Sequence, residues 1–307
     1  MLHRVWKGVV GDDHMYHSSS PDGLTWTDQQ QIRGRTSHGP ALAVFNNRLH
    51  RAWKAAGDAR IYHSSSPDGL TWTDPQQIRG DTNRGPALVA WNNTLYLAWK
   101  ASTSTSMFMS SLSSDGRWLP LPHPAIAGST SHTPALSVGA GLYSDYLYCL
   151  WKGADTDTRM FLAAGSSEDD WLLQPGHEWR VVGLGDEWGV VGRTSHGPAL
   201  CPLGGRLYCL WKGEGSDSRT FISYSTNGQK WSWSPPQQVS GQTSHGPALA
   251  TGPGGKFYRL WKNPDNAIMI SIGTFGLFGI EWGVKWTAEQ QIVGLTSNTP
   301  SLVNLGR

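Results

Sequence analysis

Short runs rich in aromatic and β-branched residues alternate with turn-forming residues along the whole chain. Typical runs are Ile61 to Ser65 and Thr71-Trp72-Thr73, and typical turns are Asn46-Asn47 and Pro67-Asp68-Gly69. Aromatic and β-branched side chains suit the pleated surface of a strand, and Asn, Asp, Gly and Pro suit hairpin turns. We find no stretch with the apolar period of an amphipathic helix. The pattern predicts an all-β protein built from many short strands.

A six-fold repeat underlies this pattern. In each copy a bulky residue and a short stretch of strand lead to Trp-Lys, and successive tryptophans of these pairs lie 46 to 60 residues apart. The copies are Leu2 to Lys7, Leu49 to Lys54, Leu95 to Lys100, Leu147 to Lys152, Leu207 to Lys212 and Phe257 to Lys262. A repeat of this length indicates an array of similar units. Such an array suits repeated binding sites, whereas catalysis needs a single active site.

A second motif runs in step with the first and reads Thr-Ser-His-Gly-Pro-Ala-Leu in its fullest form. Its copies are Thr36 to Leu42, Thr82 to Leu88, Thr130 to Leu136, Thr194 to Leu200, Thr243 to Leu249 and Thr296 to Leu302. Each repeat holds about four short strands, which is typical of a propeller blade. In the best-formed unit the predicted strands are Gly39 to Phe45, Leu49 to Lys54, Arg60 to Ser65 and Thr71 to Ile78.

The two ends of the chain predict a closed ring. The chain begins at the second strand of a blade and ends with a lone first strand, Thr296 to Leu305. Pairing these ends completes a sixth blade and removes open sheet edges. We therefore predict one six-bladed β-propeller domain of four-stranded antiparallel blades, closed by the C-terminal strand. A solenoid of the same units is the alternative, against which the split blade argues. The predicted blades are residues 296–307 with 1–33, then 36–79, 82–127, 130–192, 194–240 and 243–293.

Composition narrows the classes of partner. The net charge of +2 and the lack of a basic run argue against binding to nucleic acid or to an anionic membrane surface. No apolar stretch approaches the length of a membrane span. The start of the chain does not read as a signal peptide, because His3, Arg4 and Lys7 interrupt a predicted strand. The expected location is therefore cytoplasmic, or outside the cell by a non-classical route.

The cysteines and histidines do not predict a metal centre. Cys149, Cys201 and Cys209 lie on predicted strands and are expected as buried free thiols, although Cys201 and Cys209 can face each other across a hairpin. Their spacing does not match a zinc site. Two of the six positions in the histidine motif carry Arg84 and Asn298, which breaks a ring of histidine ligands. We expect neither a metal nor a cofactor.

Two hairpin sequences carry a family resemblance. Ser20-Pro21-Asp22-Gly23-Leu24-Thr25-Trp26 and Ser66-Pro67-Asp68-Gly69-Leu70-Thr71-Trp72 resemble the Asp-box hairpin, Ser-x-Asp-x-Gly-x-Thr-Trp, of sialidases and related propellers. Both are one residue shorter than that motif, because Gly follows Asp directly. The resemblance implies a propeller in which this hairpin is a structural turn, on the face away from the active site. The repeat also resembles tandem-repeat propellers of bacteria and fungi, several of which are lectins with sugar sites in or between blades.

The Trp-Lys pairs are the first candidate ligand-binding groups. An ammonium group can donate to sugar hydroxyls and an indole face can stack on a sugar ring, which predicts a pocket lined by the lysine and the loop after it. The structural alternative is that the tryptophan packs between blades while the lysine ends a strand and pairs with an acid. The candidates are Lys7, Lys54, Lys100, Lys152, Lys212 and Lys262, with Trp53, Trp151, Trp211, Asp58 and Asp217.

The Thr-Ser-His motif supplies the second candidate set. In a propeller, the loop between the second and third strands and the entry to the next first strand lie at the same end of the blades. Trp-Lys, the acidic loop and Thr-Ser-His are therefore expected to meet on one rim. The ligand candidates in this motif are His38, Arg84, His132, His196 and His245. The structural alternative is a polar turn whose side chains bind loop backbone.

The enzyme alternative rests on the propeller resemblance. Sialidases carry an arginine triad, a Tyr-Glu pair and an early Arg-Ile-Pro or Arg-Leu-Pro segment, and this chain has no such segment and no clear Tyr-Glu pair. A two-carboxylate glycosidase needs only spatial proximity, so a glycoside hydrolase or lyase stays open as an alternative. A protein-interaction scaffold is the third hypothesis, and oligomers fit any of the three.

The leading prediction is a multivalent, non-catalytic lectin that binds glycans or glycoconjugates through repeated sites on one rim. Blades with the full motif, such as the one with Lys54 and Asp58, are expected to bind best. The third blade has Ser102-Thr103-Ser104 in place of the acidic loop and is expected to be weak or empty. Insertions near residues 174–191 and 273–284 are the alternative location for binding.

Overall fold

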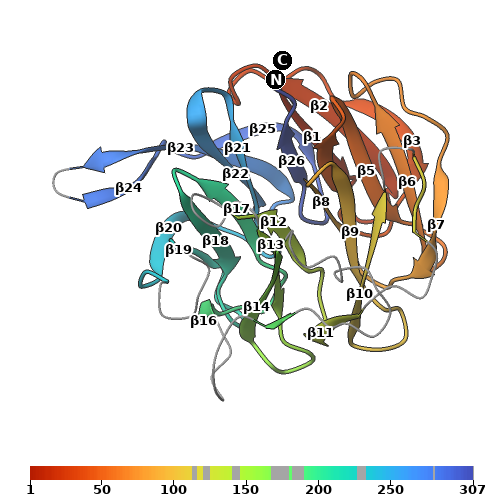
Figure 1. Ribbon diagram of the computed structural model, residues 1–307. Helices are drawn as coiled ribbons and strands as arrows, with labels where there is room; N and C mark the ends of the chain where they lie inside the picture. The colour runs from red at the N-terminus through yellow and green to blue at the C-terminus, as the bar shows by residue number, and fades with distance from the viewer. Residues whose placement is uncertain are drawn as a thin grey trace.

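Six antiparallel sheets stand around one central axis (Figure 1). The computed structural model describes residues 1–112, 116–119, 125–139, 146–166, 180–181, 190–226, 233–278 and 281–306. The prediction of a six-bladed β-propeller is confirmed. Most of the predicted insertion at 174–191 lies outside the described residues. Within the described residues, no helix is long and apolar enough to cross a membrane.

The first three blades each contain four strands, which follow one another from the axis outward. Blade 1 contains β26 (Ser301–Asn304), β1 (Leu2–Lys7), β2 (His14–Ser20) and β3 (Gln30–Arg35). Blade 2 contains β4 (Ala41–Phe45), β5 (Arg48–Lys54), β6 (Arg60–Ser66) and β7 (Gln76–Asp81). Blade 3 contains β8 (Ala87–Trp91), β9 (Thr94–Lys100), β10 (Ser106–Leu112) and β11 (Ala125–Ser129).

The other three blades follow the same plan with additions. Blade 4 contains β12 (Ala135–Val138), β13 (Tyr146–Lys152) and β14 (Arg159–Ser166), with β15 (Arg180–Val181) and β16 (Val190–Arg193) both paired to β14. Blade 5 contains β17 (Ala199–Leu203), β18 (Arg206–Lys212), β19 (Arg219–Ser225) and β20 (Gln237–Gln242). Blade 6 contains β21 (Ala248–Gly252), the 3-10 turn η4 (Pro253–Gly255), β22 (Lys256–Lys262), β23 (Ala267–Phe278), β24 (Glu281–Trp286) and β25 (Gln290–Leu295). The β23–β24 hairpin projects from the body of the propeller (Figure 1).

The two ends of the chain close the ring inside blade 1. β26 pairs antiparallel with β1, from Leu2 opposite Asn304 to Val5 opposite Ser301. The backbone of Met1 and Leu305 continues the ladder, with the Leu305 N–H donating to the Met1 carbonyl at 2.9 Å. The predicted closure is confirmed, and every blade therefore packs between two neighbours.

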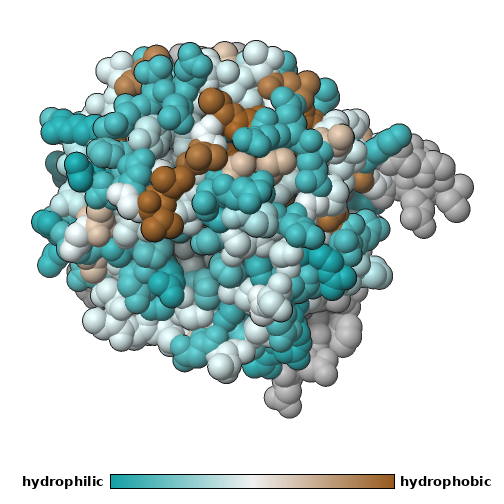
Figure 2. All heavy atoms as spheres, turned by 180° about the vertical axis from the view of Figure 1, so that it is seen from behind, coloured by the Kyte–Doolittle hydropathy of each residue, from teal (hydrophilic) through white to brown (hydrophobic). Residues whose placement is uncertain are grey.

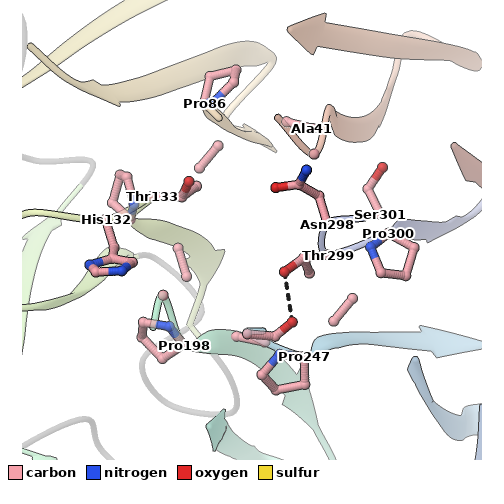
Figure 3. A pocket seen from close by; sticks show the side chains of 18 of the residues that line it. Ala41, Pro86, His132, Thr133, Pro198, Pro247, Asn298, Thr299, Pro300 and Ser301 are labelled. Carbon is pink, nitrogen blue, oxygen red and sulfur yellow. Dashed lines mark hydrogen bonds between the residues drawn. The ribbon is translucent and has the colours of Figure 1, made fainter. Parts of the chain in front are cut away.

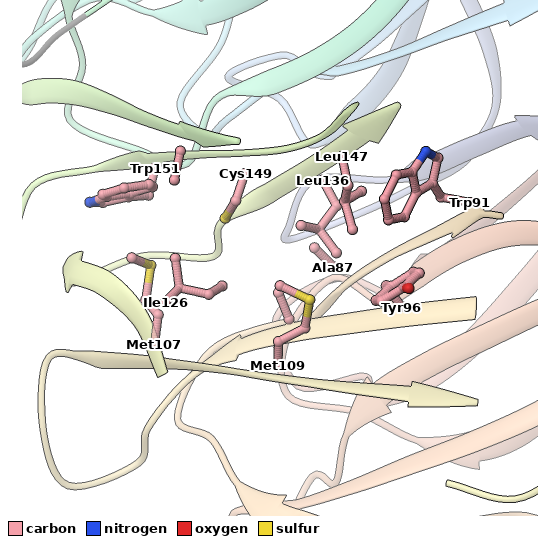
Figure 4. Packing of buried hydrophobic residues seen from close by; sticks show 12 residues of the cluster. Ala87, Trp91, Tyr96, Met107, Met109, Ile126, Leu136, Leu147, Cys149 and Trp151 are labelled. Atoms are coloured by element: carbon pink, nitrogen blue, oxygen red, sulfur yellow. The ribbon is translucent and has the colours of Figure 1, made fainter. Parts of the chain in front are cut away.

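The hydrophobic core lies between the blades, not within one sheet. Figure 4 shows the layer between blades 3 and 4, where Trp91, Tyr96 and Met109 of blade 3 face Leu136 and Leu147 of blade 4. The second strand of a blade is covered on both faces by this packing. All six residues of β1 are buried, for example, although the strand includes His3, Arg4 and Lys7. Burial on both faces explains why these strands lack a simple apolar–polar alternation.

Each Trp-Lys indole packs against a glycine of the preceding blade. Gly80 lies at φ +133°, and a Cβ atom there would come within 2.6 Å of Cζ2 of Trp99. The same fit recurs where the ladder between the third and outermost strands shifts register, at Gly34, Gly128, Gly192, Gly241 and Gly294. Glycine permits both the left-handed backbone and the close approach of the ring.

In three consecutive blades a buried arginine binds the neighbouring blade. The Arg51 guanidinium lies between the rings of Trp53 and Trp72, at 4.7 and 4.3 Å from their centroids, and donates to the Arg33 carbonyl in blade 1 at 2.6 Å. Arg4 and Arg259 are placed in the same way between two indoles. Burial lowers the pKa of Arg51 to about 9. Blades 3, 4 and 5 carry Leu97, Cys149 and Cys209 at this position.

The outermost strand of blade 2 begins later than the sequence predicts. Thr71 and Trp72 belong to a turn, and β7 starts at Gln76. The Asp68 carboxylate accepts hydrogen bonds from the backbone N–H groups of Leu70 and Thr71 at 2.8 Å each. These bonds hold the chain in a turn that a strand cannot accommodate, and the β-propensity of Thr-Trp does not overcome them. The three cysteines are free and buried, as expected.

We predict that Gly80→Ala destabilises the fold much more than Gly57→Ala. A methyl group at residue 80 meets the Trp99 ring and requires a strained backbone, whereas a Cβ at residue 57 has open space around it. The expected loss in the free energy of unfolding is more than about 1 kcal/mol for Gly80→Ala, against little change for Gly57→Ala. Chemical denaturation of both variants measures the difference. Equal effects would contradict the packing of the indole on this glycine.

Buried histidine pairs predict acid sensitivity. His3 with His17 and His50 with His63 stack within blades 1 and 2, with ring nitrogens 3.0 Å apart in each pair. Burial, and then the neighbouring cations and imidazoles, lower the pKa of His17 and His63 to about 3 and that of His50 to about 4.

We expect the free energy of unfolding to fall as the pH is lowered from 7 to 5. Unfolded histidines take up protons near their ordinary pKa of about 6.5, whereas folded His17, His50 and His63 stay neutral down to their lowered pKa values. The stabilisation is fully present above that pH and is lost progressively toward the folded pKa values. Each histidine contributes up to about 1.4 kcal/mol per pH unit in this window. Urea denaturation at several pH values measures how steeply the free energy of unfolding falls with pH. The double variant His50→Gln/His63→Gln should show a weaker dependence. A free energy of unfolding that does not change between pH 7 and pH 5 in the native protein would contradict this prediction.

Candidate binding sites at the blade junctions and the axial mouth

The ammonium group of each Trp-Lys lysine lies inside the loop that follows it, which we call the post-lysine loop. Lys54 Nζ donates to the carbonyl oxygens of Ala55 at 2.9 Å and Asp58 at 2.7 Å, and to Ser37 Oγ at 2.9 Å. Lys212 Nζ contacts three loop carbonyls and Ser195 Oγ in the same way. The other four lysines also bond the loop and the preceding Ser or Asn; they are Lys7, Lys100, Lys152 and Lys262.

These contacts correct the structural alternative for the lysine. That alternative predicts a pair with an acidic side chain, but Lys54 binds the main-chain carbonyl of Asp58, and the Asp58 carboxylate binds Arg60 instead. Burial lowers the pKa of Lys54, which the charge of Asp58 partly opposes. The lysine residues are 3% to 9% exposed, and their ammonium groups donate to the carbonyl oxygens of the loop.

The same lysine connects the post-lysine loop to the axis of the propeller. Ser37, which accepts from Lys54, contacts His38 Nδ1 at 3.0 Å. Thr36 is fully buried, and its backbone N–H donates to the carbonyl of Asp13 in the preceding blade at 2.8 Å. Trp-Lys, the loop and Thr-Ser-His thus meet on one rim, as expected. The rim therefore carries two kinds of site, one on each side of the lysine.

On the outer side, three post-lysine loops end in an Asp-x-Arg pair. Arg159 holds Asp157 in a two-pronged contact, with Nε to Oδ1 at 2.9 Å and Nη2 to Oδ2 at 2.8 Å, and Arg219 holds Asp217 at the same distances. Arg60 and Asp58 form the third pair. The hydrogen bonds from Arg159 lower the pKa of the Asp157 carboxyl. The arginine side chains are 51% to 57% exposed.

Each of these guanidinium groups lies over an aromatic ring on the same strand. Arg159 is 5.3 Å from the centroid of Phe161, and Phe161 in turn stacks on the buried Trp151. Arg219 over Phe221 and Arg60 over Tyr62 repeat the arrangement. Carboxylate, guanidinium and ring therefore form one connected unit at the surface of each of these three blades.

A cleft lies beside this unit at the junction of blades 3 and 4. It has a volume of about 320 Å³ and is lined by Gly128 and Ser129 of blade 3 and by Trp151, Gly153, Ala154, Asp157 and Phe161 of blade 4. We call this place the junction cleft and use the same name for the corresponding position before each other blade, although the cleft itself is established between blades 3 and 4. The floor is apolar and aromatic while one wall carries a carboxylate, which is the mixture that small polar ligands require.

The blades differ in this unit in a simple way. Blades 2, 4 and 5 have the complete Asp-x-Arg pair over an aromatic ring. Blade 1 has Asp12 bound to His14 Nδ1 at 2.8 Å and to the Tyr16 hydroxyl at 2.8 Å. Blade 3 has Ser104 and Ser106 at the two positions, and in blade 6 the loop is closed by Asn263. Three junctions are therefore complete, one is altered and two lack the pair.

On the inner side, six side chains surround the opening of the central channel, which we call the axial mouth. They are His38, Arg84, His132, His196, His245 and Asn298. The rings of His132, His196 and His245 follow one another with centroids 5.4 Å apart. Below them the channel narrows at Gly39, Gly85, Thr133, Gly197, Gly246 and Thr299, and then meets rings of proline, alanine or serine, and leucine (Figure 3). The cavity has a volume of about 360 Å³.

The narrowing of the channel depends on close backbone packing. A Cβ at Gly246 would come within 2.2 Å of the Gly197 carbonyl oxygen. The two threonines lie in opposite blades, and Thr299 Oγ1 donates to the Gly246 carbonyl at 2.7 Å (Figure 3). The six prolines stand at the start of the innermost strands, where the missing N–H suits a sheet edge. The channel is thus polar at the mouth and apolar further in.

The structure places the predicted site residues in two distinct groups. The five axial candidates lie together at the mouth, and Asp58 and Asp217 lie at junction clefts. The lysines lie between the two groups, under the loops. Trp53, Trp151 and Trp211 are 2% exposed, so the expectation that their faces stack on a sugar does not agree with their burial between blades. Sequence reasoning missed the arginines and aromatic rings of the junction clefts.

The repeated Asp-x-Arg spacing carried the signal that could have revealed the missed residues. Asp58-Ala59-Arg60, Asp157-Thr158-Arg159 and Asp217-Ser218-Arg219 stand at equal positions in their repeats. Separately, Asp12, Asp13 and His14 are close enough to hold a metal ion. Within this cluster Asp12 accepts hydrogen bonds from His14 and Tyr16.

The comparisons with known proteins agree with the six-bladed fold. No protein-family model matches the sequence, and no curated protein matches it. Aleuria aurantia lectin, a fungal lectin with a six-bladed β-propeller fold and a novel fucose recognition mode, is 13% identical with a TM-score of 0.64 over 97% of this chain and 92% of that one. A structure of the same lectin with Fucα1-6GlcNAc is 12% identical, with a TM-score of 0.62 over 97% and 96% of the chains. At these identities the likeness establishes the architecture.

We predict that Lys54→Met destabilises the protein by about 3 kcal/mol, because it leaves Ser37 Oγ and two loop carbonyls without their donor. The surface side chain of Lys256 provides the control, and Lys256→Met should change the free energy of unfolding by less than about 0.5 kcal/mol. Chemical denaturation compares the two. A small effect of Lys54→Met, with ligand binding lost, would instead assign the lysine to a ligand.

Proposed function

We propose that the protein is a multivalent, non-catalytic carbohydrate-binding propeller whose sugar sites are the junction clefts. The observation that carries the proposal is the Asp-x-Arg pair, which lies over an aromatic ring in blades 2, 4 and 5 and borders a cleft at the junction of blades 3 and 4. A sugar presents hydroxyl groups that both donate and accept hydrogen bonds, and an apolar C–H face. Carboxylate, guanidinium and aromatic ring match these three features.

The arrangement suits recognition without chemistry. Arg159 uses two of its five N–H donors on Asp157, which fixes the pair before a ligand arrives. Such preorganisation lowers the entropy cost of binding. The pairing also keeps Asp157 ionised, because the guanidinium lowers its pKa, and an ionised carboxylate accepts from hydroxyl groups but cannot donate a proton to a leaving group.

The proposed multivalency rests on the three complete Asp-x-Arg pairs around the ring. If each pair marks a sugar site, several weak contacts with a surface that displays many glycans together give strong avidity. Blade 1 is proposed as a weaker site, and blades 3 and 6 as empty ones. On the face shown in Figure 2, hydrophobic residues form short separate strips among hydrophilic ones. The likeness to a fucose-binding fungal propeller lectin supports the same class of ligand.

We predict that removing the arginines one at a time removes sugar sites one at a time. A glycan array first identifies a bound monosaccharide, and titration calorimetry then counts the sites per chain. Arg60→Leu, Arg159→Leu and Arg219→Leu should each lower the number of sites by one, and the triple variant should lose binding to glycan-coated surfaces.

A matched control is the exposed pair of Arg33 and Asp74 at the outer edge of blades 1 and 2. Arg33→Leu should leave the number of sites unchanged. Complete loss of binding in any single variant would point to one shared site, and turnover of a glycoside substrate would favour the hydrolase alternative. An array without a hit from folded protein at high density counts against carbohydrate binding altogether.

A further inference from the structure

Arg84 breaks the symmetry of the axial mouth by adding a permanent charge. Its Nε donates to the Ser131 carbonyl of blade 4 at 2.9 Å, and Nη1 donates to the Asn83 carbonyl at 3.2 Å. Both acceptors are neutral main-chain oxygens. In the described part of the chain Arg84 forms no ion pair, and none of the residues that line the cavity is Asp or Glu. The guanidinium charge at the mouth is therefore not neutralised by a carboxylate.

Three of the neighbouring histidines are arranged as hydrogen-bond donors toward the mouth. Ser131 Oγ accepts from Lys152, and we assign its own proton to His132 Nδ1 at 3.0 Å because the alternative acceptor, the Gly153 carbonyl, is farther away at 3.5 Å. The same relation holds for His38, and for His245 with Ser244. An imidazole that accepts at Nδ1 carries its proton on Nε2. In each of these three histidines the Nε2–H group therefore lies on the side of the imidazole away from the serine.

The surrounding charges favour an anion at this place. Burial lowers the pKa of His132 to about 3, and the charges of His196, Lys152 and Arg84 act in the same direction. Burial likewise lowers the pKa of His38 to about 4, together with Arg84, Lys54 and Lys7. Burial, as the first cause, keeps these imidazoles neutral, and the fixed charges that act on them, those of the lysines and Arg84, are positive. The positive potential of these fixed charges attracts an oxyanion.

We propose that the axial mouth binds one oxyanion, a carboxylate or a sulfate group, anchored by Arg84 and by the Nε2–H groups of the neighbouring histidines. Guanidinium groups bind such planar or tetrahedral anions through charge-assisted hydrogen bonds. Because only one blade carries arginine at this position, each molecule has a single such site. It differs from the junction clefts in place, charge and number.

An acidic monosaccharide is the ligand class that fits the whole cavity. Its volume of about 360 Å³ lies within the range of small-molecule sites and exceeds the needs of a bare anion. Donors at the mouth suit a carboxylate or sulfate, and the proline and leucine rings further in suit C–H surface. The step from oxyanion to acidic sugar rests on the proposed function, whereas the anion site does not.

Titration calorimetry of the full chain at pH 7 and constant ionic strength tests the site. The probes are sulfate, acetate, glucuronate and glucose. We expect one molecule of sulfate or glucuronate per chain, glucuronate bound more tightly than acetate, and no axial binding of glucose. Arg84→His should weaken anion binding about tenfold, the effect of losing one charge-assisted hydrogen bond. This variant carries the residue that four other blades have, so it should fold.

Arg79→Gln is the matched control, because it removes one exposed positive charge from β7, away from the mouth. The anion site is overturned if Arg84→His and Arg79→Gln lower the affinity for the anion equally. It is also overturned if the native protein shows no saturable anion binding. Glucuronate no tighter than acetate overturns the acidic-sugar step alone. Arg159→Leu separates the two proposals, because it should spare axial anion binding. If neutral glycans fail to bind while sulfate binding still depends on Arg84, the proposed function falls and the axial site remains.

Discussion

Six buried ammonium groups, one in each blade, hold the functional rim of this propeller together. Each sits at the end of a strand that is covered on both faces, and each binds loop carbonyls that would otherwise be buried without a donor. The same nitrogen binds the serine or asparagine that precedes the innermost strand of its own blade. A neutral side chain of this length cannot supply several donors at one point, which explains why lysine stands at all six positions. The cost of burying the charge is offset by neutral main-chain dipoles.

Both proposed sites depend on this lysine. On its outer side the ordered loop places Asp-x-Arg at the junction with the preceding blade. The middle residue of Asp-x-Arg contacts the next blade, because its carbonyl accepts from the backbone N–H of a buried threonine there, as Ala59 does from Thr82. On its inner side the serine fixes the histidine that faces the axis. The scaffold is therefore symmetric. The proposed binding properties differ between blades through a few residues, such as Arg84 at the axis, or Ser104 and Ser106 in place of the Asp-x-Arg pair in blade 3.

The repeat was sufficient to predict the fold, and it was only partly sufficient for the sites. The Trp-Lys interval and the lone strand at the C-terminus predicted six blades and their closure, because strand order in a propeller follows directly from the period. For the same reason the sequence predicted that the candidate residues of the axial mouth lie on one rim. Burial of the Trp53 indole between blades agrees with the structural alternative, whereas the main-chain partners of the Lys54 ammonium were not predicted. Sequence alone does not show which polar groups main-chain atoms will use. Arg60 was missed because its importance comes from Asp58 and Tyr62 together, and their contact becomes visible only with the strand register.

The central claim is that the lysine-held loop presents a sugar site wherever it ends in Asp-x-Arg. A crystal structure of the protein soaked with the monosaccharide that it binds best tests this most directly. The account predicts sugar in the clefts that precede blades 2, 4 and 5, in contact with Arg60, Arg159 and Arg219, and none before blades 3 and 6. Sugar bound equally before all six blades, or bound only against the lysines, would contradict it.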